Sequence, residues 1–488
     1  MAAQQHPAAA LPGSNAEASF SSLLPVAAGV EASNAAASDA YADRVPASTF
    51  SQLPSLQPHR ASAVTVSQPN GNVTFLDCPA ISRSFLLGKT LADCLMGKVK
   101  LARQHTLGAD GSRSDTGVAV AIKVMLKSCI RGRVTRDGRP VAENPEEEIQ
   151  AMMFLGPHPH LLNLQALATD EAHVFLVMDL APGGDLFGRV SMNAQPQSRL
   201  AEDDARRYFL QLALGVQYMH ARGIVHRDLS LENVMLDAND CVKVIDFGLM
   251  KQVTLPAGGP LNGQRVGKGG YMPPEVYKAN RLADARSVDV WCIGVMLFIM
   301  LFGVPPYRTA DAARCRLFAE LAGGRLLRLL THWGMDGHAS AEAKDLVVRM
   351  LQPVAADRPS LAEILQHPWL AEHHAEYRHA VFPGTNHDEL VEWMEGATAE
   401  AQATGGAGCL SAERVASAPG DWGVQWRKQH GLSAVVAAAA TPPTPGSGEW
   451  TSTPVVLPSD VSGGGGGAGG SLRISAPPHQ DEDGDILG

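Results

Sequence analysis

Three polar side chains that could bind a metal ion through an oxygen atom lie close together in the sequence. The stretch GIVHRDLSLENVML (223–236) contains Asp228 and Asn233, and CVKVIDFGL, which follows it, contains Asp246. The apolar runs NVML and CVKVI predict two strands joined by the turn residues DAND, a hairpin that brings the three side chains toward one site. Oxygen ligands of this kind suit Mg²⁺, which also takes oxygens from substrate phosphates. A solvated turn rich in Asp would explain any one of these residues, but not all of them at these spacings.

A lysine interrupts the apolar run GVAVAIKVML (117–126). The run predicts a buried strand, and lysine is rarely buried without an anionic partner. Farther along, EEEIQAMMFLG predicts an amphipathic helix with Glu148 beside its apolar face, whereas Glu146 and Glu147 are expected to face water. Glu148 is therefore a candidate partner for Lys123. The alternative is an edge-strand lysine whose ammonium reaches water.

The elements that position these residues are expected in the central part of the chain, where apolar residues recur regularly. Residues 1–80 are rich in Ala, Ser and Pro, and residues 371–488 are mostly rich in Gly, Ala and Pro. Such compositions bury too little apolar surface to offset the entropy of ordering, so both ends are predicted to be disordered tails. The stretch between them, 81–370, is long enough for one two-lobed domain.

Composition narrows the class of protein. The 488 residues carry 40 Lys and Arg against 50 Asp and Glu, a net charge of −10 without long blocks of one sign, which disfavours a nucleic-acid binder. The seven cysteines are scattered and form no CxxC pair, a pattern that fits a reducing compartment and no structural zinc. No secretory signal is visible at the N-terminus, so a cytoplasmic or nuclear protein is expected.

The stretch VWCIGVMLFIMLFGVPP (290–306) carries no charge and raises the question of a membrane span. Its length is at the short edge of what crosses a bilayer, and it lies inside the globular region and ends in Pro-Pro. A buried core helix is the preferred interpretation, and no membrane association is expected.

Five motifs occur in a recognisable order: VAIK, HRDLSLEN, DFG, YMPPE and VDVWCIGVMLFIMLFGVPPY. Together they resemble a eukaryotic protein kinase, over roughly residues 81–370. FLVMDLAPGGDLF and the terminal HPWL resemble most the serine/threonine kinases of the calmodulin-dependent and AMP-activated group. The resemblance implies an α+β, two-lobed fold, with a small β-rich N-lobe containing one helix (81–180) and a large helical C-lobe (181–370).

The resemblance also implies ATP and Mg²⁺ as cofactors and assigns roles to particular residues. Lys123 would hold the α- and β-phosphates and would itself be held by Glu148. Asp246 and Asn233 would bind Mg²⁺. Asp228 would orient the substrate hydroxyl and accept its proton. The residues implied to surround ATP are Leu91, Ala92, Asp93, Cys94, Leu95, Met96, Gly97, Lys98, Val99, Ala121, Lys123, Met178, Asp179, Ala181, Asp185, Glu232, Asn233 and Asp246.

Two further sets of residues match structural features of the family. Met152, Leu164, His226 and Phe247 match the apolar stack that aligns in active kinases. Asp289 matches the residue that anchors the catalytic loop from the buried helix.

The first departure from the family pattern lies in the phosphate-covering loop LADCLMGKV (91–99), where the family pattern is G-x-G-x-x-G. Ala92 and Cys94 replace the first two glycines, and only Gly97 remains. Glycine permits close backbone approach and unusual φ and ψ angles, so the altered loop is expected to cover ATP less freely.

The second departure concerns Ser230 and Lys268. Kinases of this group usually have Lys at the first position and Thr at the second, and in the family fold the two side chains touch each other and the catalytic aspartate. We interpret the pair as a reciprocal exchange in which Lys268 supplies the positive charge from the activation segment and Ser230 supplies the hydroxyl. The alternative is two independent changes and an impaired site.

The third departure concerns regulation. Arg227 corresponds to the arginine that pairs with a phosphorylated activation-segment residue in many relatives. Thr254 is the only Ser or Thr between Phe247 and Tyr271. Constitutive activity, or control by a partner or by the tails, is therefore expected in place of the usual phosphothreonine.

Two functions remain open on the sequence. The leading one is an active serine/threonine kinase, expected as a monomer, that prefers protein substrates with a basic residue upstream because Asp185 and Glu232 are acidic. The rival is a pseudokinase scaffold, suggested by Ala92, Cys94 and Ser230. The tails are candidate sites for a regulatory protein. A calmodulin-binding helix at 421–436 is disfavoured, and DELVEWMEG (388–396) is a candidate short helix that packs back on the large lobe.

Overall fold

The computed structural model describes residues 59–68, 71–191, 199–255, 264–279 and 284–381, together with Val391. All of them belong to one compact unit, Met1–Ala438; the second unit, Ala439–Gly488, lies outside the described residues.

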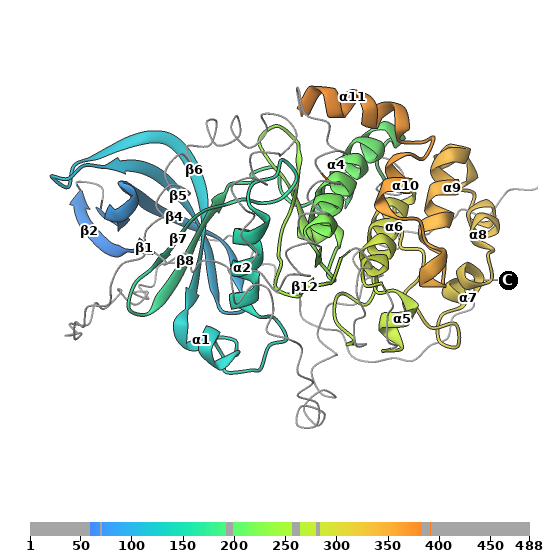
Figure 1. Cartoon of the computed structure of the whole chain (residues 1–488), viewed down its shortest axis with the longest axis horizontal. Coiled ribbons are helices and arrows are strands. Elements are labelled where there is room, and N and C mark those ends of the chain that lie inside the picture. The colour runs from blue at the N-terminus through green and yellow to red at the C-terminus, as the bar shows by residue number, and fades with distance from the viewer. Residues whose placement is uncertain are drawn as a thin grey trace, which may run out of the picture. The chain divides into compact units, whose positions relative to one another are not determined.

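An eight-stranded sheet forms the N-lobe (Figure 1). Its strands follow the order β1-β7-β8-β6-β5-β4-β3-β2 and pair antiparallel, except that β1 runs parallel to β7. The strands are β1 (His59–Arg60), β2 (Ser62–Gln68), β3 (Gly71–Cys78), β4 (Arg83–Cys94), β5 (Gly97–Leu107), β6 (Arg113–Leu126), β7 (Leu164–Thr169) and β8 (His173–Asp179). One face buries an apolar cluster that includes Phe85, Ile122 and Val177.

The N-lobe begins earlier than the sequence suggested. Residues 59–78 were expected within a disordered tail, but they form β1, β2 and β3 of the same sheet. Leu76 and Cys78 are fully buried in its core, so the predicted boundary at residue 80 is wrong. Apolar residues alternate with polar ones in SAVTVSQ and GNVTFLDC, a strand pattern that the Ala- and Ser-rich average composition concealed.

The N-lobe also contains two α-helices where one was expected. The extra helix, α1 (Lys127–Gly132), directly follows β6 and buries Cys129 and Ile130. The predicted helix is α2 (Pro145–Leu155), which begins with Asn144 as N-cap and Pro145 in its first turn. The Asn144 side chain accepts hydrogen bonds from the backbone N–H groups of Glu146 and Glu147, and the acidic first turn complements the helix dipole.

The C-lobe is mainly helical. Its α-helices are α3 (Leu186–Ser191), α4 (Glu202–Ala221), α5 (Pro274–Tyr277), α6 (Arg286–Phe302), α7 (Arg316–Ala322), α8 (Leu326–His332), α9 (Ala341–Met350), α10 (Leu361–Leu365) and α11 (Ala371–Val381). Its short strands are β9 (Ile224–Val225), β10 (Val234–Leu236), β11 (Val242–Val244) and β12 (Lys251–Gln252). Short 3₁₀ helices connect these elements: η4 (Leu231–Asn233), η5 (Asp336–His338) and η6 (Ala355–Asp357), with η3 (Pro79–Ile81) in the N-lobe.

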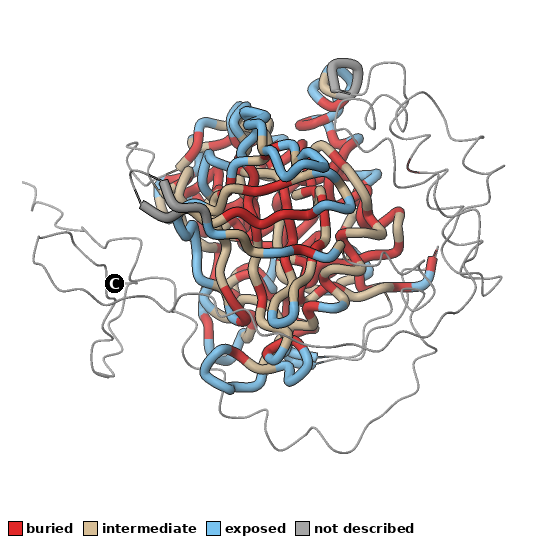
Figure 2. The backbone as a smooth tube through the Cα atoms, turned by 90° about the vertical axis from the view of Figure 1, so that its left-hand side faces the viewer, coloured by how far each residue is buried: buried red, intermediate tan, exposed pale blue. Residues whose placement is uncertain are grey.

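The uncharged stretch around 290–306 forms the centre of this lobe. Every residue of α6 from Val288 to Phe302 is buried, and α4, α9 and η6 pack against this helix. Figure 2 shows how much of the described chain is buried in this way. No helix in the described part of the chain is long and apolar enough to cross a membrane. The predicted core helix is confirmed.

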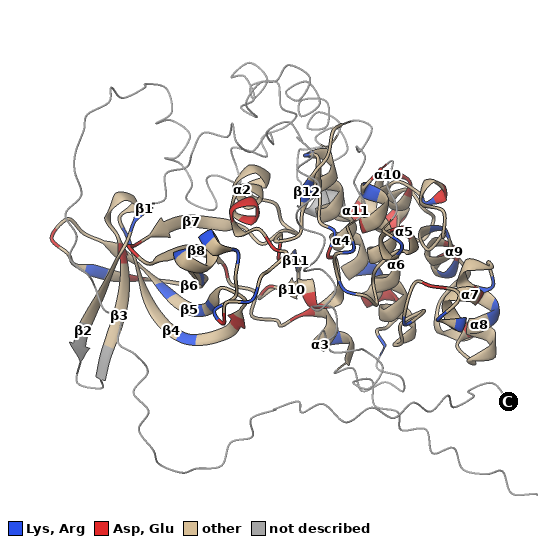
Figure 3. Cartoon of the chain, turned by 90° about the horizontal axis from the view of Figure 1, so that it is seen from below, with Lys and Arg blue, Asp and Glu red and all other residues tan. Residues whose placement is uncertain are grey.

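The C-lobe extends beyond residue 370, where a tail was expected to begin. Residues 371–381 form α11, and the Tyr377 hydroxyl lies 3.1 Å from His160 Nε2 in the body of the domain. Charged residues of both signs are interspersed over the described ribbon (Figure 3).

Candidate active site

Lys123 on β6 and Glu148 on α2 form a buried ion pair. Lys123 Nζ lies 2.7 Å and 2.8 Å from the two oxygens of Glu148, a residue that is only 5% exposed. Burial alone would lower the pKa of the Lys123 ammonium, but the carboxylates of Glu148 and Asp246 outweigh it and raise that pKa. Lys123 is therefore a charged, fixed cation on which the Asp246 carboxylate of the DFG segment also acts, and the alternative of a lysine reaching water is wrong.

Glu147 is not free in water as expected. Its carboxylate lies 3.1 Å from Lys251 Nζ, on strand β12 of the activation segment. Two consecutive glutamates of α2 therefore pair with lysines from different lobes.

Asp289 anchors the catalytic loop from the buried helix α6. It is fully buried, and its two carboxylate oxygens accept the backbone N–H groups of His226 and Arg227, each at 2.8 Å. Burial acts to raise the pKa of Asp289, yet the hydrogen bond from His220, at 2.8 Å, and the backbone donors hold it below its ordinary value. A charged carboxylate thus fixes a loop in which Arg227 adopts a φ of 69°.

Arg227 itself is buried, at 7% exposure. Burial lowers the pKa of its guanidinium, and the charges of Asp289 and Glu147 oppose that shift. The residue thus lies where the carboxylates of α6 and α2 both act on it.

Asp228 and Asn233 are joined by hydrogen bonds. Asn233 Nδ2 donates to the Asp228 backbone oxygen at 2.7 Å and to its Oδ2 at 3.0 Å. Burial raises the pKa of Asp228, and the positive charge of Lys268 opposes that shift. The amide nitrogen of Asn233 is therefore engaged with Asp228, and its amide oxygen is the atom left for a cation.

The predicted hairpin brings Asp246 to the same end of the site. Strand β10 pairs antiparallel with β11, with Val234 opposite Val244, so Asn233 and Asp246 flank the same end of the hairpin. Asp246 has a φ of 65°, in the left-handed region. Its side chain accepts a long hydrogen bond from Gly248 N–H, at 3.4 Å.

Lys268 and Ser230 contact each other as the exchange predicts. Lys268 Nζ donates to Ser230 Oγ at 2.8 Å, and its backbone N–H donates to Asp228 Oδ1 at 3.1 Å. Gly267 makes this approach possible: its φ is 94°, and a Cβ there would lie 2.7 Å from the Arg227 carbonyl oxygen. Lys268 Nζ also lies 3.7 Å from Glu232, which places a negative charge beside it.

The phosphate-covering loop is the β4–β5 hairpin. A Cβ on Gly97 would lie 1.8 Å from the Val124 carbonyl oxygen of β6, so this position tolerates no side chain. Ala92 is exposed and Cys94 is half-buried, so both positions have room for their side chains. Gly97, the glycine that the chain keeps, is thus the one that packing requires. The expectation that the altered loop covers ATP less freely stays a prediction.

The remaining residues of the loop lie on the β4–β5 hairpin, and their contact with ATP stays a prediction. Val99 is paired with Lys123 across the β5–β6 ladder, which places the loop directly beside the lysine. Met96 is buried, whereas Leu91 and Leu95 are 43% and 45% exposed. The other members, Asp93 and Lys98, pair opposite each other in the hairpin.

Four residues of the set implied to surround ATP lie on β6, at the end of β8 and just after it. Met178 pairs with Ala121 across β6 and β8, and both are buried together with Ala181. The carboxylate of Asp179 accepts hydrogen bonds from the Asn163 and Gln165 side chains, each at 2.8 Å, so this side chain is occupied by structural contacts.

Asp185, another residue implied to lie beside ATP, has a structural contact of its own. Its Oδ1 accepts the Gly188 N–H at 2.6 Å, within the first turn of α3. The other predicted acid, Glu232, accepts a hydrogen bond from the Tyr271 hydroxyl at 3.1 Å.

The apolar stack is assembled. His226 and Phe247 are buried with their ring centroids 5.5 Å apart, and Met152 is 5% exposed. Leu164 packs against the same apolar cluster, which spans both lobes. Helix α2 and the DFG segment are therefore held in register.

Glu143, which the sequence patterns did not single out, also reaches the site. It precedes α2, and a Cβ on Gly248 would lie 3.0 Å from Glu143 Cγ. Burial, reinforced by the Asp246 carboxylate, raises the pKa of Glu143 to about 7. No local pattern marks such a residue, because its importance comes from a segment more distant in sequence.

The donor set suits a magnesium nucleotide. Asp246 and Asn233 offer a carboxylate and an amide oxygen, which are hard ligands, and a Mg²⁺ ion completes its shell with phosphate and water. Among the described residues, no group of three His, Cys, Asp or Glu side chains that could hold a metal ion occurs. Lys123 adds a cation for phosphate oxygens.

Comparison with known proteins gives the family. A model of the protein kinase domain matches residues 109–370, more than half of the chain. The two-lobed fold and the site define a protein kinase domain, and the chain belongs to that family.

Curated relatives include plant kinases. The chain is 36% identical over 287 residues to CBL-interacting protein kinase 4 of Oryza sativa subsp. japonica, covering 58% of each chain. It is 32% identical over 283 residues to CBL-interacting protein kinase 9 of the same organism, covering 58% of this chain and 56% of the relative. For CBL-interacting serine/threonine-protein kinase 26 of Arabidopsis thaliana the identity is 31% over 296 residues, 61% of this chain and 60% of the relative. The chain thus matches somewhat over half the length of these relatives.

Proposed function

We propose that this chain is an active serine/threonine protein kinase that transfers the γ-phosphate of Mg·ATP to protein hydroxyls. The observation that carries the proposal is the Lys123–Glu148 ion pair, 2.7 Å long, formed while Asp228, Asn233 and Asp246 lie around one site. In kinases this pair and the DFG aspartate must both be in place for phosphoryl transfer.

Each residue has a task that its geometry supports. ATP would supply the phosphoryl group, and Mg²⁺ would neutralise part of the charge on its phosphates. Lys123 holds phosphate oxygens, and Asn233 and Asp246 would hold Mg²⁺ through their oxygens. Asp228, oriented by Asn233 Nδ2 and by the Lys268 backbone N–H, accepts the proton of the substrate hydroxyl.

Lys268 supplies the positive charge that a lysine at position 230 supplies in the usual arrangement. Its Nζ lies 2.8 Å from Ser230 Oγ, and its charge acts on Asp228, so it is close enough to stabilise negative charge that develops during transfer. Ser230, fully buried, orients that ammonium by accepting its hydrogen bond. The altered pair therefore supports catalysis and gives no support to a pseudokinase.

Substrate choice follows from the acids at the mouth of the site. Asp185 directly precedes α3, Glu232 lies in η4, and these two elements pack against each other. The two acids favour a substrate with a basic residue upstream of its Ser or Thr. Lys268 and Tyr271 already engage Glu232, so a substrate arginine competes with them for that carboxylate and the preference is weakened.

Control by another protein is proposed for the tails. The names of the relatives state that they interact with CBL. Thr254 is the one Ser or Thr between Phe247 and Tyr271 in this chain, which leaves little room for control by phosphorylation there. A regulatory protein that binds outside the domain is a consistent alternative.

The test is phosphate transfer from Mg·ATP by the full chain to a library of Ser and Thr peptides, with and without an upstream arginine. Asp228→Asn is the matched control, because it keeps the side-chain shape and removes the base. Transfer that Asp228→Asn abolishes establishes the kinase. Absence of transfer, while Mg·ATP still raises the melting temperature, would overturn the proposal in favour of a nucleotide-binding scaffold.

A further inference from the structure

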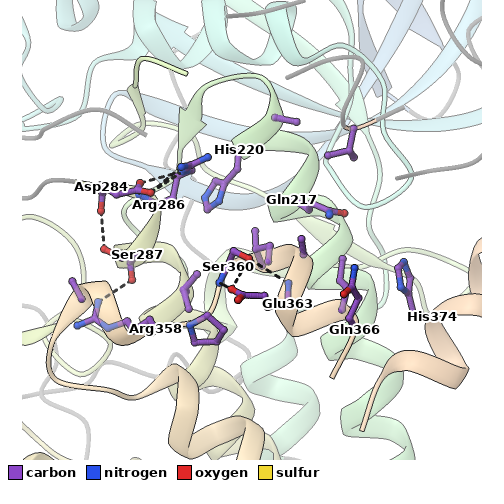
Figure 4. Close-up of a pocket in the computed structure, with 18 of the residues that line it drawn as sticks. Gln217, His220, Asp284, Arg286, Ser287, Arg358, Ser360, Glu363, Gln366 and His374 are labelled. Carbon is purple, nitrogen blue, oxygen red and sulfur yellow. Dashed lines mark hydrogen bonds and ion pairs between the residues drawn. The ribbon is translucent and has the colours of Figure 1, made fainter. Parts of the chain in front are cut away.

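A cavity of about 970 Å³ lies in the C-lobe, among α4, α6, α10 and α11. Gln217 of α4, Leu361 of α10 and His374 of α11 line it, and Figure 4 shows the polar side chains around it. None of the residues assigned above to ATP, Mg²⁺ or the substrate is among its lining residues. Its size is in the range of sites that bind ligands or short peptide segments.

Val391, beyond the end of α11, is part of this cavity wall. It is 8% exposed and helical, although its neighbours in sequence lie outside the described residues. Val391 belongs to the same apolar cluster as Val290, Leu361 and Leu365, which also line the cavity. The chain after α11 therefore returns to the C-lobe core at this residue.

Gln217 indicates which polar group an occupant of the cavity would need. Its side chain is more than nine-tenths buried, at 8% exposure, and lines the cavity. Within the described part of the chain, its Oε1 has no hydrogen-bond partner. A buried acceptor left without a donor is costly, so an occupant with an N–H group directed at Gln217 would be favoured.

We propose that residues 388–396, DELVEWMEG, occupy this cavity as an intramolecular ligand of the C-lobe, with Val391 as the apolar anchor. Leu390, Val391, Trp393 and Met394 recur at the spacing of one helix face; Glu392 lies between the two apolar pairs, and Glu389 and Glu395 flank them. The Trp393 indole N–H, which can only donate, is the partner for Gln217 Oε1.

The tether favours this occupant over a second copy or a separate protein. Helix α11 ends at Val381, and its residues Ala371, His374 and Ala375 line the cavity. The residues that connect Val381 to the segment reach at most about 3.6 Å each when fully extended. The segment therefore stays near the cavity. A short tether gives the attached segment an effective concentration in the millimolar range, far above that of a free partner.

The first test uses the full chain and needs no catalysis, so its failure is separate from failure of the proposed kinase activity. Val391→Asp places a charge in the apolar wall, and Val415→Asp, farther along the same tail, is the matched control. Hydrogen exchange of the amides in α10 and α11 is followed in both variants. The proposal expects exchange about tenfold faster in Val391→Asp and unchanged exchange in Val415→Asp.

Three outcomes would overturn the proposal. Unchanged exchange in Val391→Asp would mean that residues 388–396 do not protect the amides of α10 and α11 beside the cavity. Loss of protection when the natural chain is diluted would mean that the segment comes from a second copy. Equal loss in both aspartate variants would mean that any charge in the tail has the effect. Val391→Ala, which only removes methyl groups, provides the same comparison if the aspartate variant folds poorly.

Gln217→Met provides an independent check of the donor. If the segment satisfies Oε1, the variant should have a lower melting temperature than the natural chain, and this loss should disappear in the Val391→Asp background. If Oε1 has no donor in the full chain, the apolar side chain should raise the melting temperature in both backgrounds, and the proposed contact with Trp393 would be wrong.

Discussion

Glu147 and Glu148 are consecutive in α2, and each binds a lysine from a different part of the fold. Glu148 holds Lys123 of the N-lobe sheet, and Glu147 holds Lys251 of strand β12, at 3.1 Å. In relatives, a phosphorylated residue of the activation segment is often what fixes that segment. Here an ion pair between two side chains of the chain itself joins α2 to the activation segment without a phosphate.

Lys251→Ala should therefore lower kcat without unfolding the protein. The pair is partly exposed, so its contribution is about 0.2–1 kcal/mol, which corresponds to a loss of up to about fivefold in kcat. Peptide phosphorylation by the variant is the measurement. Arg349→Ala, which removes a partly exposed pair with Asp345 on the distant helix α9, is the control and should leave kcat unchanged. Equal losses in the two variants would mean that the Glu147 pair has no special role.

Lys268→Thr should lower kcat by about 10²-fold, roughly 3 kcal/mol, because it removes the cation beside Asp228. The double variant Ser230→Lys, Lys268→Thr restores the arrangement usual in relatives and should recover most of the rate. Steady-state kinetics with one peptide on the three proteins makes the comparison. A natural rate in Lys268→Thr alone, or no recovery in the double variant, would contradict the reciprocal exchange.

Gly97→Ala should destabilise the N-lobe, because the added Cβ would lie 1.8 Å from the Val124 carbonyl oxygen. Forcing apart the β5–β6 ladder should cost about 3 kcal/mol of unfolding free energy, measured by denaturant titration. Gly337→Ala, at a site where a Cβ meets nothing within 4 Å, is the control. If the two variants are equally stable, the loop accommodates a side chain at residue 97 after all.

Glu143→Gln should stabilise the nucleotide-free protein increasingly as the pH rises. The pKa of Glu143 is about 7 in the folded chain against 4.5 as its ordinary value. Between these values the folded state holds a proton that the unfolded state has lost, so the natural chain loses stability as the pH rises through this window. The charged groups that act on Glu143 are Asp246, Lys123, Glu148 and Asp228.

The measurement is the free energy of unfolding of both proteins across that window. The advantage of Glu143→Gln should grow up to about pH 7 and then level off. Glu146→Gln, at an exposed position in the first turn of α2, should show no such growth. A constant difference between Glu143→Gln and the natural chain at all pH values would contradict the raised pKa.

Local patterns predicted most of the site. Each of three elements follows from a run of neighbouring residues: the β10–β11 hairpin, the amphipathic helix with Glu148 and the apolar helix α6. The amino-acid sequence alone was therefore enough to predict these elements and the site residues that they carry. The contact between Lys268 and Ser230 followed from the family resemblance, because two departures made sense together. The catalytic roles of these residues stay predictions.

The remaining features depend on contacts that no local pattern encodes. Glu147 looked solvated because its partner, Lys251, lies in another lobe, and Glu143 looked ordinary because Gly248 approaches it only in the folded chain. The β2–β3 hairpin was missed for a different reason. Its alternation of Val64 and Val66 with polar residues was diluted by the Ala- and Ser-rich residues before it.

The early strands have a practical consequence for handling the protein. Strand β1 pairs with one edge of the N-lobe sheet, at β7, while β3 pairs with the other side, at β4. A fragment that begins at residue 81 would leave backbone N–H and C=O groups of both β7 and β4 unpaired, and would expose the apolar surface that Leu76 covers. Open strand edges recruit other chains, so such a fragment should aggregate during purification, whereas one that begins before His59 should remain in solution.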